Sequence, residues 1–225
     1  MSKNEILEKL KNAIIDLGDE DVSRLVKEGL EAGLSPAEII NHGLGAGLTV
    51  LGEGFANAER FMSELMIAGQ IMTDVVEMLR PVMEKSGRQL GDTMILGTVQ
   101  NDLHDIGRKI VGAMFTGAGY TVIDIGGDAA ASEFVKAAKE HKAIIVGASA
   151  ILTPVMPYCK VINDALVDAG IRDDVIYIVG GSNMTQRWSD DVGADCYGQT
   201  AIDAVHKIKM IRAGELPKIK KRLGK

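Results

Sequence analysis

Cysteine is scarce in this chain of 225 residues. The two that occur, Cys159 and Cys196, stand far apart, and neither has a second cysteine or a histidine at the short spacing of a zinc site. A disulfide scaffold and a cysteine-bound structural zinc are therefore excluded. We expect both thiols to be small, buried apolar side chains.

Long apolar runs are also missing. The hydrophobic fraction is 46%, but no uninterrupted run approaches the roughly 20 residues that cross a bilayer. The first residues, "MSKNEILEKLKNAIIDLG", mix acidic and basic side chains with apolar ones, unlike a secretory signal or a transit peptide. We expect a cytoplasmic protein with no membrane partner.

Positive charge is in short supply as well, because 25 Lys and Arg residues face 31 Asp and Glu residues, for a net charge of -6. Binding to nucleic acid requires a concentrated positive surface, so we expect no nucleic-acid partner. The one basic run, "KIKKRLGK", belongs to a C-terminal tail that we place at 214–225 and interpret as a solvated terminus.

What the sequence does contain changes character along the chain. Residues 1–86 repeat helical periodicity, with helices predicted over 6–17, 19–32, from 36 onward and over 63–84. The third of these starts with Ser35 as N-cap and Pro36 at the first helical position. It also carries five glycines, which lower helix propensity and indicate close packing against another surface. We predict a four-helix bundle.

A polar stretch at 87–92 reads as a linker, and a different pattern follows over 93–213. Short apolar runs there alternate with amphipathic stretches that begin near residues 106, 131, 154, 184 and 200. The runs are 93–99, 121–125, 143–148, 175–179 and 194–197. This alternation predicts an α/β fold, a doubly wound, flavodoxin-like parallel sheet of five strands, with ligands bound beyond the carboxyl ends of the strands.

The first strand-to-helix turn, "NDLHDIG", lacks the GxGxxG of dinucleotide sites, and the chain has no phosphate-binding P-loop. The turn instead offers Asp102, His104 and Gly107 in the pattern DxHxxG. A carboxylate beside one imidazole nitrogen can fix the tautomer of a histidine that binds a metal through the other. The pair can equally be a helix cap next to a solvent-facing histidine.

Two further strand ends carry small or hydroxyl residues. "GASAILTPVMP" contains Ser149 and Thr153, and "VGGSN" contains Gly180 and Gly181. Small residues at neighbouring strand ends predict a slot in the sheet edge that suits a long, thin group.

These three motifs, in this order and spacing, resemble the cobalamin-binding domain of methyltransferases and mutases. With its helical bundle the whole chain is similar to small corrinoid proteins of methylamine, methanol, betaine and methoxyaromatic methyltransferase systems. The resemblance implies that His104 replaces the dimethylbenzimidazole of the cofactor as the lower ligand of cobalt, with Asp102 as its partner. The displaced nucleotide tail then fills the slot. The other implied cofactor contacts are Asp105, Ile106, Gly107, Ser149, Ile151, Thr153, Gly180 and Gly181, and, from the Met-rich bundle, Phe61, Met62, Leu65 and Met66.

By the same resemblance the chain is a carrier and not a complete enzyme. A substrate-specific methyltransferase loads a methyl group onto Co(I), and the resulting methylcobalamin form passes it through a second methyltransferase to coenzyme M or tetrahydrofolate. A reductive activation protein is a further implied partner. Movement of the bundle is expected at a hinge near Gly87 and Gly91.

Two positions depart from the family pattern. Ile151 replaces the leucine of Ser-x-Leu, a volume-conserving change. Val155 stands where a hydroxyl often completes a proton relay, so we expect the path behind His104 to end, or turn, at Asp102. The competing readings are a cobalamin-binding subunit of an adenosylcobalamin-dependent mutase, a cobalamin-based sensor and a signalling domain without metal.

Overall fold

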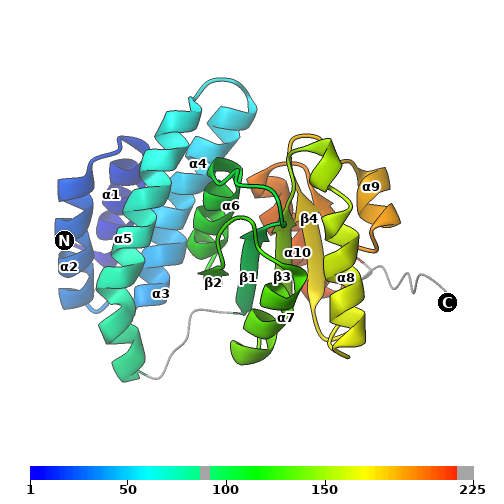
Figure 1. The fold of residues 1–225 in the computed structure, drawn as a ribbon. Helices are drawn as coiled ribbons and strands as arrows, with labels where there is room; N and C mark the ends of the chain where they lie inside the picture. Colours follow the sequence, from blue (N-terminus) through cyan, green and yellow to red (C-terminus); the bar gives the residue numbers. More distant parts are fainter. Residues whose placement is uncertain (87–91, 217–225) are drawn as a thin grey trace. The chain divides into compact units, whose positions relative to one another are not determined.

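The computed structural model describes residues 1–86 and 92–216, and the chain divides into two compact units (Figure 1). The first comprises Met1–Gly91 with Ala113–Thr121, and the second Asp92–Gly112 with Val122–Lys225. The domain limits expected from the sequence stay predictions. All but the last residue of the expected linker, and the expected tail beyond residue 216, lie outside the described residues.

The first unit contains the expected helices. Its core is formed by the apolar faces of the helices, and serine caps start two of them, since Ser2 and Ser35 each form a capping box with a glutamate three residues later. The elements are α1 (Lys3–Ile15), α2 (Asp19–Glu31), α3 (Pro36–Glu38), the π-helix η1 (Ile39–Leu44), α4 (Gly45–Ala56) and α5 (Met62–Ser86).

The third predicted helix is therefore a composite, because η1 interrupts it between α3 and α4. The backbone N–H of Gly45 donates to the carbonyl of Ile40, five residues back, as a π-helix requires. Periodicity did not reveal this segment.

The glycines of this composite helix pack closely, as expected, where they meet α1. A Cβ atom added to Gly43 would lie 3.0 Å from the side chain of Leu10. One added to Gly47 would lie 2.5 Å from the carbonyl oxygen of Lys11. Only residues without a side chain allow the two helices to approach this far.

The second unit is built on a five-stranded sheet with the order β2-β1-β3-β4-β5, the flavodoxin-like order expected from the sequence. β1, β3, β4 and β5 pair in parallel. The strands are β1 (Thr93–Thr98), β2 (Thr121–Asp124), β3 (Ile145–Ser149), β4 (Ile176–Gly180) and β5 (Cys196–Gly198).

Helices cover both faces of this sheet. α7 and α8 pack against each other on the face that buries Ile95, Val146 and Tyr177. Gly112 of α6 approaches Leu96 and Ala204 of α10 approaches Gly198 on the other. The elements are α6 (Ile106–Gly117), α7 (Ala131–Glu140), the 3₁₀ turn η2 (Thr153–Val155), α8 (Tyr158–Asp168), α9 (Gln186–Asp191) and α10 (Ala201–Ala213).

Small side chains line the carboxyl ends of four neighbouring strands. The register pairs Thr98 with Ser149, Ser149 with Gly180, and Gly180 with Gly198. Ser149 and Gly180 are thus the last residues of their strands, where the sequence had placed them just after. We call this row of four residues the strand-end row.

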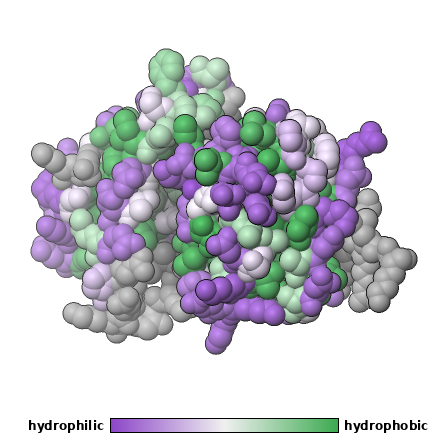
Figure 2. Space-filling model, viewed as in Figure 1, coloured by the Kyte–Doolittle hydropathy of each residue, from purple (hydrophilic) through white to green (hydrophobic). Residues whose placement is uncertain are grey.

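No helix within residues 1–86 or 92–216 is long and apolar enough to cross a membrane. On the face shown in Figure 2, hydrophobic side chains are scattered among hydrophilic ones.

Candidate functional site

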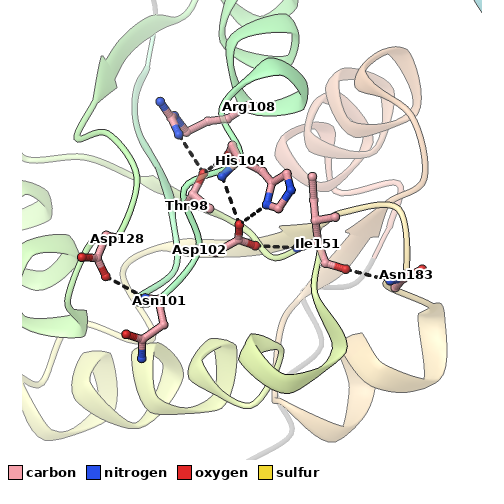
Figure 3. A network of polar contacts seen from close by, with 8 residues as sticks. All are labelled: Thr98, Asn101, Asp102, His104, Arg108, Asp128, Ile151 and Asn183. Carbon is pink, nitrogen blue, oxygen red and sulfur yellow. Dashed lines mark hydrogen bonds and ion pairs between the residues drawn. The ribbon is translucent and has the colours of Figure 1, made fainter.

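The loop between β1 and α6 holds a buried carboxylate, Asp102, which is 1% exposed. Its Oδ1 atom accepts hydrogen bonds from the backbone N–H of His104 at 3.1 Å and from His104 Nδ1 at 2.5 Å. Its Oδ2 atom accepts the backbone N–H of Ile151, beyond β3, at 2.8 Å (Figure 3). Asp102 therefore ties the histidine to a loop about 50 residues further along the chain.

These contacts decide the protonation of the pair. Burial raises the pKa of Asp102, but the hydrogen bonds from Ile151 and His104 outweigh it and hold the pKa below its usual value. An ionised carboxylate can only accept, so the Nδ1 atom of a neutral His104 carries the proton. The Nε2 lone pair is then free, on a side chain that is 50% exposed.

His104 offers a single nitrogen to a metal. Within the described parts of the chain, no group of three or more His, Cys, Asp or Glu side chains could hold a metal ion. A metal bound here must bring its remaining ligands with it, which a macrocyclic complex does and a free ion does not.

A second chain of contacts holds the backbone of His104, and sequence reasoning missed it. Thr98 Oγ1 lies 2.9 Å from the carbonyl oxygen of His104 and 2.7 Å from Arg108 Nη1. Arg108 Nε in turn contacts Asp124 Oδ1 at 2.8 Å. A threonine ending a strand and an arginine opening a helix gave no sequence signal for this arrangement.

The loop is also joined to the turn after β2. Asp128 Oδ1 accepts the backbone N–H of Asn101 at 2.7 Å (Figure 3). The backbone N–H of Asp128 donates to the Asp102 carbonyl at 2.8 Å. Asn101 and Asp128 both adopt positive φ, at 65° and 53°. Asn and Asp tolerate this left-handed region better than most residues, which explains their presence in these tight turns.

Exposed apolar side chains lie close in sequence to the pair. Leu103 is 79% exposed, and Ile106 and Leu152 are each 45% exposed. Ile106 is one of the cofactor contacts that the family resemblance implies, whereas the two leucines carry no sequence signal, because a single apolar residue in a loop does not reveal its exposure.

The residues predicted to line a slot lie at strand ends or in the loops that follow them. Ser149 and Gly180 are neighbours in the strand-end row. Gly181 has a φ of 141°, and a Cβ atom there would overlap the carbonyl oxygen of Ala150. Thr153 is exposed and starts η2, while the Ile151 carbonyl accepts a hydrogen bond from Asn183 Nδ2 at 2.8 Å.

The remaining residues near the turn have simple roles in the structure. Asp105 forms an ion pair with Lys109 at 2.6 Å, and no atom lies within 4 Å of a Cβ atom added to Gly107. Val155 is buried and offers no hydroxyl. The partner on the far oxygen of Asp102 is instead the backbone N–H of Ile151.

In the helical unit, three of the four apolar residues expected to face the cofactor are exposed. Phe61 is 76% exposed, Met62 39% and Met66 43%, whereas Leu65 is 2% exposed and belongs to the core of the bundle. The structure therefore separates Leu65 from the other three.

Comparison with known proteins gives a consistent result. Residues 93–206 and 6–80 each match a family described as B12 binding domain. The chain is 39% identical to trimethylamine corrinoid protein 1 of Methanosarcina acetivorans, over 93% of this chain and 98% of that protein. It is 40% identical to the dimethylamine corrinoid protein of Methanosarcina barkeri, over 95% and 100% of the two chains.

A solved structure agrees with the sequence relatives. The methanol:cobalamin methyltransferase complex MtaBC of Methanosarcina barkeri matches with a TM-score of 0.80 at 28% identity, over 97% of this chain and 84% of that one. These matches confirm the resemblance drawn from the DxHxxG turn, the serine stretch and the Gly-Gly pair. The chain belongs to the family of B12-binding corrinoid proteins.

Proposed function

We propose that this chain is a corrinoid methyl carrier. Its task is to receive a methyl group from a substrate-specific methyltransferase and to present it to a second one. A bound corrinoid supplies a cobalt ion that can accept a methyl group and release it again. The protein supplies ligation, orientation and exclusion of water.

The observation that carries this proposal is the Asp102–His104 pair. Its geometry leaves Nε2 as the one imidazole nitrogen free to bind a metal, which suits a metal whose other positions are filled by a macrocycle. His104 is assigned as the lower ligand of cobalt. Asp102 keeps the proton on Nδ1 and raises the basicity of Nε2, as carboxylate partners of metal-bound histidines do.

Other residues of the sheet unit are assigned to the rest of the cofactor. The displaced nucleotide tail is assigned to the strand ends around Ser149, Thr153, Gly180 and Gly181. Two of these are glycines, and the φ of 141° at Gly181 excludes any other residue without strain. Asp105, Ile106, Gly107 and Ile151 are assigned to the lower face beside His104, where exposed apolar side chains suit a large flat ligand.

In the helical unit, Phe61, Met62 and Met66 are assigned to shielding the cofactor. An aromatic ring and two flexible thioethers adapt readily to a macrocycle, and all three are exposed in the described structure. Leu65 is not assigned to this role, because it is a buried core residue.

The partners follow from the relatives. One related structure is the methanol:cobalamin methyltransferase complex MtaBC. Two sequence relatives are corrinoid proteins named for trimethylamine and dimethylamine. We propose a methyltransferase partner for loading, with a methylated amine as the first donor to test. A second methyltransferase acting on coenzyme M or tetrahydrofolate, and a protein for reductive activation, complete the proposed system.

The test is reconstitution of the full chain with hydroxocobalamin, followed by gel filtration and absorbance spectroscopy. The wild-type protein should retain the corrinoid in a histidine-ligated form. His104→Ala should lose the histidine-ligated spectrum, whereas His206→Ala, which removes an exposed histidine from α10, should keep it. Failure of the wild-type protein to retain any corrinoid would overturn the proposal.

Methyl transfer is tested separately. The reduced, loaded protein is mixed with candidate methyltransferases and a panel of methylated amines, betaines, methanol and aryl methyl ethers, and formation of the methylated cofactor is followed by absorbance. No methylation with any partner and donor, despite tight corrinoid binding, would contradict the carrier role.

A further inference from the structure

Arg108 is a buried cation at the N-terminal end of a helix, a position that disfavours positive charge. It lies in the first turn of α6, where the helix dipole disfavours positive charge, and it is only 5% exposed. Buried charges persist only when they are paired and hydrogen-bonded. The contacts of Arg108 must therefore account for its presence.

Those contacts close a ring. Arg108 Nε donates to Asp124 Oδ1 at 2.8 Å, and Arg108 Nη1 donates to Thr98 Oγ1 at 2.7 Å. The same Asp124 oxygen accepts the backbone N–H of Gly126 at 2.9 Å, and the Gly126 carbonyl accepts the backbone N–H of Thr98, also at 2.9 Å. The ring joins the end of β1, the start of α6 and the turn after β2, and we call it the Arg108 ring.

The direction of the bonds follows from the chemistry of the groups. A guanidinium has donors and no acceptor, so Thr98 Oγ1 must accept from Arg108. The single hydroxyl proton of Thr98 is then left for another acceptor. The carbonyl oxygen of His104 lies 2.9 Å away and receives it (Figure 3).

This bond holds a group that the helix leaves free. The first α6 bond in this turn runs from the Lys109 N–H to the carbonyl of Asp105, so the carbonyl of His104 lies just outside the helical ladder. His104 is thereby fixed from two sides. Asp102 holds its ring and its N–H, and Thr98 holds its carbonyl.

We propose that Arg108, Thr98 and Asp124 are positioning residues that fix the backbone of His104 and so set how strongly its imidazole binds a metal. This inference rests on the proposed function, because it takes His104 as the cobalt ligand. A ligand whose backbone is held in place loses less freedom on binding, so the bond is stronger than on a mobile loop.

The experiment uses Thr98→Val, which keeps the shape of the side chain and removes the hydroxyl. Thr98→Ser retains the hydroxyl. The matched control is Thr49→Val in α4, which deletes a hydroxyl bond of the same length, 2.9 Å, to the carbonyl of Gly45. Far-UV circular dichroism and the fluorescence of Trp188, the one tryptophan, verify folding.

Each full-length variant is loaded with cobalamin and reduced to Co(II). Electron paramagnetic resonance then gives the fraction with nitrogen splitting from an axial histidine. The loss of one hydroxyl–carbonyl bond should lower the ratio of ligated to unligated cobalt by roughly 2- to 12-fold in Thr98→Val. Thr98→Ser and Thr49→Val should stay within about 2-fold of wild type.

The outcomes are separable. If the wild-type protein shows no nitrogen splitting, His104 is not the ligand and the assignment under the proposed function fails. If the wild type shows splitting and Thr98→Val matches it, the positioning role alone is overturned. Should Thr98→Val fail to fold, Asp124→Asn tests the same ring, because the Asp124 side chain is 38% exposed and its change disturbs the interior less. Loss of this charge should also lower the ratio of ligated to unligated cobalt. An unchanged ratio refutes the proposal.

Discussion

Replacing Asp102 by asparagine should destabilise the sheet unit even without a cofactor. The two carboxylate oxygens accept three hydrogen bonds, two from His104 and one from Ile151. Asparagine has one oxygen and one NH₂ group. In either orientation of the amide, its NH₂ group faces a backbone N–H, which is also a donor. At least one hydrogen bond is therefore lost, and two donors face each other without an acceptor.

The magnitude follows from the charge on the carboxylate. Hydrogen bonds to charged groups contribute about 1.5 to 3 kcal/mol each. Asp102 is buried, so solvent does not replace the missing partner. We expect Asp102→Asn to lower the free energy of unfolding by about 2 to 3 kcal/mol at pH 7.

The pH dependence has a definite sign. The folded-state pKa of Asp102 lies below its ordinary value, so the carboxylate contributes stability that is present above about pH 4. That stability is lost as the pH falls through the lower folded-state pKa. The difference between wild type and Asp102→Asn should therefore narrow from pH 4 downward.

Urea unfolding followed by Trp188 fluorescence measures both quantities, because Trp188 packs against the core of the sheet unit. Asp168→Asn, an exposed carboxylate of α8, serves as the control and should leave stability within about 0.5 kcal/mol of wild type. This account of Asp102 would be refuted if Asp102→Asn were as stable as wild type at pH 7. It would also be refuted if the difference in the free energy of unfolding between the two proteins stayed constant down to pH 3.

Three further outcomes are expected. Gly181→Ala should lower stability by about 3 kcal/mol or more in thermal unfolding, because the φ of 141° is strained for alanine and its Cβ would overlap the Ala150 carbonyl. Gly47→Ala should lower the free energy of unfolding by about 1 to 2 kcal/mol, as followed by far-UV circular dichroism. The new Cβ would overlap the Lys11 carbonyl oxygen, and the cost of this overlap exceeds the gain in helix propensity. Burial raises the pKa of the Cys159 thiol to about 12, so a disulfide reagent at pH 8 should modify it in urea and not in the folded protein.

Much of the fold was predictable, because the helices and strands follow from the local spacing of apolar residues. The apolar spacing of Ile6, Leu10 and Ile14 predicted a helix, and these residues are the buried face of α1. Five short apolar runs predicted the sheet, and its order places the DxHxxG turn at the expected strand end. The limits of most elements moved by one or a few residues, and the third predicted helix proved to contain a π-helical segment.

The rest depends on contacts between distant residues. The partner of Asp102 on its far oxygen is a backbone N–H at Ile151, and an N–H carries no sequence signal. Arg108 and Asp124 are 16 residues apart, and each alone reads as a solvated charge. The π-helix at Ile39–Leu44 escapes a search for a period of 3.6 because it breaks that period.

The strand-end row differs from the interior of the same strands in the size of its side chains. Three registers back from it, the sheet aligns Ile95, Val146 and Tyr177, which are large and fully buried. The row itself, Thr98, Ser149, Gly180 and Gly198, contributes almost no apolar bulk. The buried interior, and not the rim, therefore supplies most of the apolar surface that these strands bury. The shape of the rim and the stability of the sheet depend on different residues of the same strands.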